Sequence, residues 1–177
     1  IRQLGAVTSK STETLGNVAN VRALSDGRVL VNDMSGRRVL MFDPQLSTFT
    51  VVADSTSATA SAYGERGGAL VAYRGDSTLF VDPASVSMLV IDPAGKIARV
   101  VAIPRAEDAN SLGSPVGNAS FDAAGRLVYR TGARMTMVNR SSASSGGGFP
   151  AISDPPDSAF IVRVDLATRK VDTAGVI

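Results

Sequence analysis

The sequence repeats itself with a long period, and this repeat limits the possible folds more than any other feature. Two copies align without a gap: Asp33 falls on Asp82, 49 residues later, and the pair Asp43-Pro44 falls on Asp92-Pro93. A repeat of this length is typical of arrays of one supersecondary unit, each of which buries its apolar surface against its neighbours.

A third copy begins at the same spacing and is then interrupted. Residues 119–130 match the first half of the repeat, but the second half, Phe160–Asp165, arrives 24 residues late. A polar insertion rich in Gly, Ser and Pro, residues 132–158, fills the delay. We expect a tolerated surface loop there; the alternative is a segment that lies over a central channel or clasps a second subunit.

Each copy reads as four short strands. Runs rich in Val, Ile, Leu and Phe are separated by Asp-Gly, Asp-Pro or Gly-Asp turns, and no segment carries a sustained helical period. Four antiparallel strands per repeat, with apolar runs that suggest sheets covered on both faces, are typical of a β-propeller blade. The predicted fold is therefore an all-β propeller with three four-stranded antiparallel blades. A β-sandwich is the alternative, but a sandwich requires no such period.

This interpretation divides the chain into two parts. Residues 1–17 form an N-terminal edge segment that could close a neighbouring blade. Residues 18–177 form a three-bladed half propeller, with blades at about 18–55, 66–104 and 116–177.

Three blades cannot close a ring, because a propeller needs about four to eight of them. A lone half ring would expose apolar faces on its first and last blades. Two copies around a two-fold axis would cover both and give six blades. We therefore predict a homodimer; the alternative is that the sequence is a fragment of a longer chain that carries the other blades.

Composition excludes several kinds of chemistry. The chain has no Cys and no His, which excludes disulfides, thiolate chemistry and imidazole acid–base catalysis. Its 18 Lys and Arg residues are spread along the chain, whereas a nucleic-acid groove needs a concentrated basic stripe. No apolar stretch approaches the roughly 20 residues of a membrane helix. The sequence begins at Ile1 with no signal peptide, so we expect a trimmed product in the periplasm or secreted.

Two segments resemble a known group of proteins. Residues 25–33 place a strand that ends in Asp after an Asp-Gly turn, and residues 91–96 run a strand into Asp-Pro-Ala-Gly. This pattern resembles the six-bladed propellers of the NHL and gluconolactonase/paraoxonase-like type. The resemblance implies a ring with an axial channel, in which oxygen atoms of Glu, Asn and Asp hold a divalent cation, usually calcium.

The resemblance also indicates where a site would lie. Asn20, Ala69 and Asn118 share the repeat position that leads into the first strand of each blade, and residues 63–68 form a charged, Gly-rich loop just before the second blade. By resemblance, the metal ligands are Asn20, Glu65 and Asn118, and the candidate catalytic residues are Glu65 and Arg66.

Each of these residues also has a structural interpretation. The two Asn side chains can satisfy backbone groups where strands begin, and Glu65 can pair locally with Arg66. Tyr73 and Asp122, at the ends of first strands, could reach the channel as well. Asp33 and Asp82, which end second strands, are predicted to cap turns.

The predicted function is metal-dependent hydrolysis of a lactone, ester or phosphotriester that binds in the axial channel. A metal-bound water would be the nucleophile. The alternative is a non-catalytic periplasmic or secreted scaffold for protein–protein interaction. A propeller fold hosts both kinds of function and does not decide between them.

Overall fold

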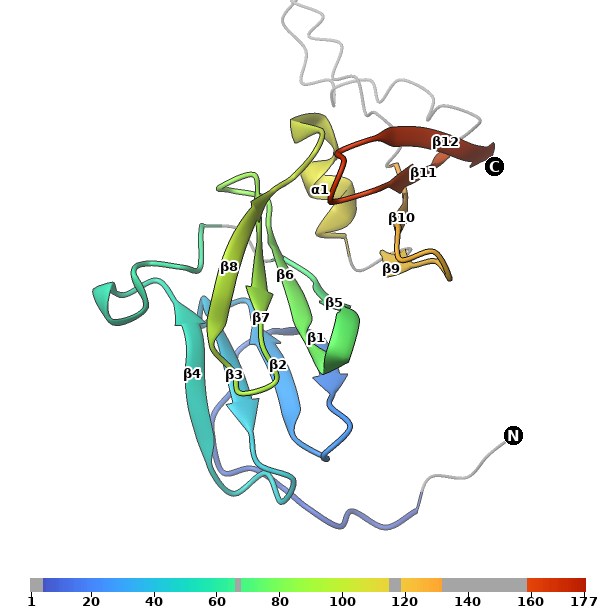
Figure 1. The fold of residues 1–177 in the computed structure, drawn as a ribbon. Coiled ribbons are helices and arrows are strands. Elements are labelled where there is room, and N and C mark those ends of the chain that lie inside the picture. The colour runs from blue at the N-terminus through green and yellow to red at the C-terminus, as the bar shows by residue number, and fades with distance from the viewer. Residues whose placement is uncertain (1–4, 66–67, 115–118, 132–158) are drawn as a thin grey trace, which may run out of the picture.

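A computed structural model describes residues 5–65, 68–114, 119–131 and 159–177. These residues form three four-stranded antiparallel sheets, each with its strands in sequence order (Figure 1). The predicted fold class, an all-β propeller built from such blades, is confirmed. The strands are β1 (Val18–Ala23), β2 (Val29–Asp33), β3 (Arg38–Phe42) and β4 (Phe49–Asp54) in blade 1, β5 (Leu70–Ala72), β6 (Thr78–Asp82), β7 (Ser87–Ile91) and β8 (Ile97–Ala102) in blade 2, and β9 (Ser120–Phe121), β10 (Leu127–Arg130), β11 (Phe160–Val164) and β12 (Val171–Val176) in blade 3.

Helices are short, as the sequence predicts. The helix α1 (Ala109–Leu112) has four residues, and the 3-10 turns η1 (Ser57–Thr59), η2 (Arg74–Asp76) and η3 (Ala106–Asp108) have three each. In the described part of the chain, no helix has the length and apolar character needed to cross a membrane.

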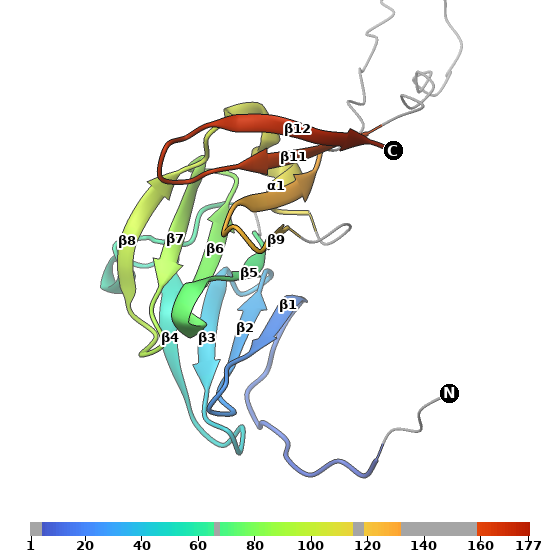
Figure 2. The same cartoon turned by 45° about the vertical axis from the view of Figure 1, so that its right-hand side comes forward.

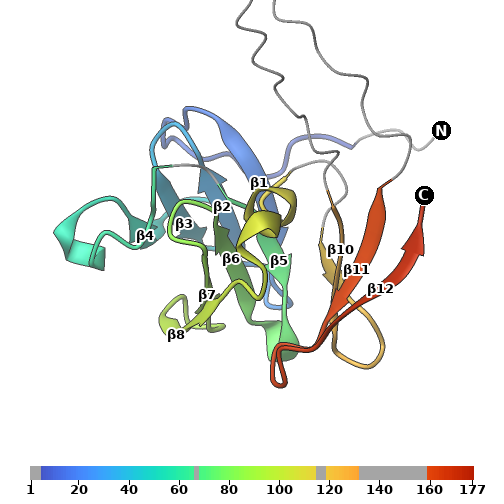
Figure 3. The same cartoon turned by 90° about the horizontal axis from the view of Figure 1, so that it is seen from above.

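Neighbouring blades pack face to face, and their apolar side chains form the core (Figures 1 and 3). Between blades 1 and 2, Leu30, Val39 and Met41 pack with Phe80 and Ile91. A second cluster joins the other face of blade 2 to blade 3; its central members are Val71, Leu79, Met88, Leu127, Tyr129 and Val164. The middle strands β2, β3, β6 and β7 are buried on both faces, which explains their nearly continuous apolar sequences.

The outer face of blade 1 is apolar, but its centre is already covered. Val31, Leu40 and Phe42 form a buried cluster with Leu15 of the N-terminal segment packed against it. The rim of this face stays open: its exposed side chains are Val21, Phe49 and Val51. The expectation of an exposed apolar face therefore holds for the rim, and the N-terminal segment shields part of the middle.

The outer face of blade 3 differs from the expected apolar surface. On β11, Ile161 and Arg163 alternate with the buried residues Val162 and Val164. Arg163 pairs there with Asp172 of β12 at 2.9 Å. Charged groups are costly to bury in an apolar core, so the ion pair makes this face suited to contact with solvent.

A buried carboxylate helps to bind the N-terminal segment to blade 1. Asp33 is 1% exposed and accepts backbone N–H bonds from Gly16 and Asn17 at 3.2 Å and a side-chain bond from Arg38 at 3.0 Å. Arg38 also pairs with Glu13 at 2.8 Å. Burial raises the pKa of Asp33, but these donors and the Gly36 N–H outweigh it and lower that pKa below its ordinary value. Residues 5–17 contain no strand, so their role as an edge strand stays a prediction.

Candidate functional site

The innermost strands of the three blades, β1, β5 and β9, follow one another along one side of the structure (Figure 2). β1 contacts β5, and β5 contacts β9. Of the predicted site residues, the structure describes two: Asn20, which is the third residue of β1, and Glu65, which comes before β5.

A buried asparagine anchors the loop that leads into blade 2. Asn32 of β2 is fully buried; its Oδ1 accepts a bond from the Tyr63 hydroxyl at 2.8 Å, and its Nδ2 donates to the Gly68 carbonyl at 2.6 Å. Tyr63 and Gly68 are the two ends of the charged, Gly-rich loop. One side chain therefore holds both ends of this loop against blade 1.

The candidate acid Glu65 lies inside this anchored loop. Its side chain is exposed, and the neighbouring carbonyl of Gly64 accepts a bond from Arg37 Nε at 3.2 Å. The backbone before Glu65 is thus attached to blade 1, while its carboxylate faces solvent and is accessible to a ligand.

Asn20 lies on β1 directly opposite Asn32 and is partly buried. Because Asn32 also bonds to Gly68, the structure brings Asn20 and the Glu65 loop to the same end of blades 1 and 2. Arg66 and Asn118, the other two predicted site residues, lie outside the described residues.

The tyrosine of this network is structural. Burial, together with the nearby negative charges of Asp33 and Asp82, raises the pKa of Tyr63 to about 12. Its phenol therefore stays protonated at neutral pH and donates to Asn32, so it does not serve as a base.

The described side chains offer the oxygen ligands that calcium prefers, but not enough of them to form a site. Calcium takes roughly six to eight oxygen ligands, and Glu65 and Asn20 offer oxygens of the right kind. Within the ranges that the structure describes, however, no three His, Cys, Asp or Glu side chains gather to hold a metal ion. Two donors are too few, and no catalytic step through a metal follows from them.

The sequence analysis did not identify Asn32 as an anchor. A signal was present: the 49-residue shift places Asn32 on Val81, so an amide stands where the second copy has an apolar residue. Asp33 and Asp82, in contrast, cap turns as predicted: Asp33 accepts the Gly36 N–H, and Asp82 accepts the Ala84 N–H, both at 3.1 Å.

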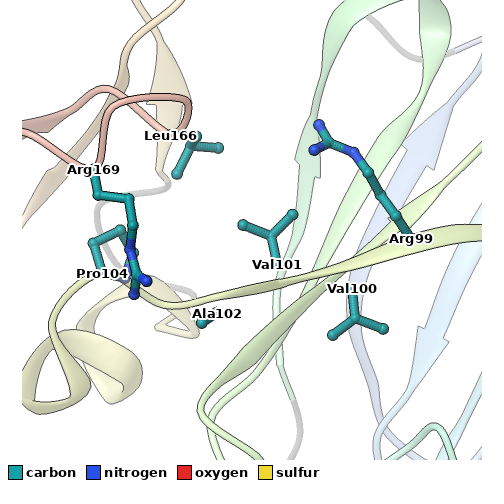
Figure 4. A pocket seen from close by; sticks show the side chains of 7 residues that line it. All are labelled: Arg99, Val100, Val101, Ala102, Pro104, Leu166 and Arg169. Carbon is teal, nitrogen blue, oxygen red and sulfur yellow. The ribbon is translucent and has the colours of Figure 1, made fainter.

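A groove of about 280 Å³ lies elsewhere, between β8 and the turn that joins β11 to β12 (Figure 4). Arg99 and Arg169 stand at opposite ends of it, with Val101 and Leu166 between them. It contains no predicted site residue.

No protein-family model matches the sequence, and no curated protein matches it. Two solved structures are similar to the chain. The virginiamycin B lyase from Staphylococcus aureus has 12% sequence identity and a TM-score of 0.49, over 86% of this chain and 39% of the lyase. A gluconolactonase from Xanthomonas campestris has 14% identity and a TM-score of 0.46, over 89% of this chain and 50% of that protein. The chain thus spans half or less of either protein, and its three four-stranded sheets identify it as part of a β-propeller.

Proposed function

We propose that the chain supplies three blades of a propeller ring that binds a small ester-like molecule and a divalent cation where the innermost strands begin. The observation that carries this proposal is the pair of hydrogen bonds in which Asn32 accepts from the Tyr63 hydroxyl and donates to the Gly68 carbonyl. They hold the loop that carries the exposed residue Glu65 against Asn32, which pairs with Asn20 on the neighbouring strand. A fixed loop that presents an oxygen donor is a suitable frame for a hard cation.

The reaction class that we propose is hydrolysis of a lactone, an ester or a phosphotriester. A cation held there would supply Lewis-acid chemistry: it would polarise a carbonyl or phosphoryl oxygen and activate water. Asn118 and the other half of the ring would provide the missing ligands. A non-catalytic scaffold is the outcome if neither cation binding nor hydrolysis is found, and the periplasmic or secreted location stays a prediction.

We propose that a second copy completes the ring. The open rim of Val21, Phe49 and Val51 supports this, because exposed apolar side chains that are grouped on one sheet face are typical of an interface. Light scattering is expected to give twice the mass of the 18.2 kDa chain. Val51→Lys is expected to shift that mass toward one chain, whereas Thr173→Lys, on the exposed surface of β12, is not. A single-chain mass for the unmodified protein would contradict the homodimer.

The cation site is tested with Glu65→Gln, which keeps the size of the side chain and removes its charge. Calcium binding by isothermal titration calorimetry is expected to weaken about tenfold or more, because a carboxylate ligand is lost. Glu107→Gln is the matched control, since Glu107 is also exposed but lies in η3.

Hydrolysis is measured in parallel on chromogenic esters and phosphotriesters. EDTA is expected to abolish it and calcium to restore it. Calcium affinity that is the same in Glu65→Gln and in the unmodified protein would remove Glu65 from the site. Activity that is insensitive to EDTA would contradict the metal-dependent mechanism.

A further inference from the structure

A pocket of about 430 Å³ lies between blades 2 and 3 at the other end of the innermost strands. It is formed by the end of β5 with the turn η2 and by β9 with the turn that follows it. The side chains that give it chemical character are Tyr73, Arg74, Phe121 and Asp122. It is separate from the loop of Glu65, which lies where these strands begin.

At the corresponding place between blades 1 and 2, side chains join the two turns. There the backbone N–H and the hydroxyl of Ser25 both donate to Asp76 Oδ2 at 2.8 Å, which joins the two turns directly. Arg22 adds an ion pair to the same carboxylate at 3.5 Å. Between blades 2 and 3, the residues at the positions of Ser25 and Asp76 are Arg74 and Gly125, which cannot form this contact.

Arg74 gives the pocket its charge. The 49-residue shift places Arg74 on Ser25 and on Ala123, so blade 2 alone has a cation at this position. Its guanidinium lies 5.9 Å from the centre of the Tyr73 ring. A Cβ atom at Gly125 would lie 2.9 Å from Arg74 Nη2, so the glycine, with φ of +74°, leaves the room that this arginine occupies.

The carboxylates around Arg74 are committed to other donors. Asp122 Oδ2 accepts a bond from Arg126 Nε at 2.8 Å. The pKa of Asp165 is lowered mainly by the backbone N–H groups of Thr168 and Ala167, and Arg74 adds only a small contribution. Within the described residues, Arg74 makes no ion pair with a carboxylate, so its charge is available to a ligand.

The apolar part of the pocket is aromatic. The rings of Tyr73 and Phe121 are 5.1 Å apart and tilted by 55°. The Tyr73 hydroxyl is held by Arg99 Nη2 at 3.1 Å, which fixes the ring in place. An aromatic wall beside one available guanidinium matches a flat anion, since planar groups stack on rings and guanidinium binds carboxylate through paired N–H donors.

We propose that this pocket binds a small planar carboxylate. The carboxylate lies on Arg74, and the flat body of the ligand packs against Tyr73 and Phe121. A ligand with one negative charge is preferred over one with two, because Asp122 also lines the pocket and would repel a second negative charge. This site is independent of the proposed cation site.

Benzoate is the probe, and benzamide is its neutral analogue of the same shape. Ligand-observed NMR titration of the unmodified protein is expected to show binding of benzoate about tenfold or more tighter than binding of benzamide. This comparison requires no variant. Equal affinity for the two compounds, or no binding of benzoate, would overturn the proposal.

Two variants locate the site. Arg74→Gln is expected to weaken benzoate binding about tenfold or more, while Arg130→Gln, an exposed arginine on β10, leaves it unchanged. Glu65→Gln is expected to leave benzoate binding unchanged, so failure at one site is distinguishable from failure at the other. Thermal unfolding of Arg74→Gln checks that it is folded. Unchanged benzoate affinity in this variant would place the ligand elsewhere and overturn the proposal.

Discussion

Gly68→Ala is expected to lower the free energy of unfolding by about 3 kcal/mol or more. A Cβ atom at this position would lie 1.5 Å from the carbonyl oxygen of Val81 and 2.7 Å from its carbonyl carbon. Both atoms belong to the backbone of β6, which is paired on both sides, by β5 and β7. A rotamer change cannot relieve this overlap, so the strand or the loop must move. Equilibrium unfolding in urea measures this decrease in the free energy of unfolding.

The same substitution reports on the candidate site. The carbonyl of Gly68 accepts the bond from Asn32 that anchors the Glu65 loop. We therefore expect Gly68→Ala to weaken calcium binding in addition to lowering stability. Gly175→Ala is the matched control: its Cβ would meet no atom within 4 Å, and its φ is not in the left-handed region. Equal stabilities of the two variants would show that residue 68 does not pack against β6.

Phe80→Ala is expected to cost about 3–5 kcal/mol of unfolding free energy, the range for removal of a buried aromatic ring. Phe80 is fully buried in the core between blades 1 and 2, and its ring centre lies 5.0 Å from that of Tyr63. The substitution therefore leaves a cavity beside Tyr63, whose hydroxyl donates to the anchor Asn32.

Phe160→Ala is the control for Phe80→Ala, because Phe160 is 49% exposed on β11 and loses less buried surface. Its effect on urea unfolding is expected to be clearly smaller. If the two alanine variants were equally stable, the packing of blade 1 on blade 2 through Phe80 would be incorrect.

Local patterns in the sequence account for most of what was predicted about the fold. Alternation between apolar runs and Asp-containing turns identifies the strands, because strand and turn preferences act within a few residues. Asp43 is an example: it follows β3 directly, and its carboxylate accepts the backbone N–H groups of Ser47 and Thr48 at 3.0 and 2.7 Å. Such contacts can be anticipated because donor and acceptor are close in the chain.

The outer faces of blades 1 and 3 could not be predicted from such local patterns. The sequence predicts that both are apolar, but Leu15 covers the middle of one and an Arg163–Asp172 pair lies on the other. Whether an apolar face is open depends on the path of a segment outside the repeat, which no periodicity describes.

The sequence by itself determined the repeat, the all-β class, the four strands of each blade and the turn positions of its aspartates. The tertiary structure alone decided that Asn32 anchors the Glu65 loop and that Arg74 has no carboxylate partner among the described residues. The reason is physical. Strands and turns follow from interactions between near neighbours in the chain, whereas the bond from Asn32 to Gly68 joins residues 36 positions apart. Such a contact exists only after two blades have packed.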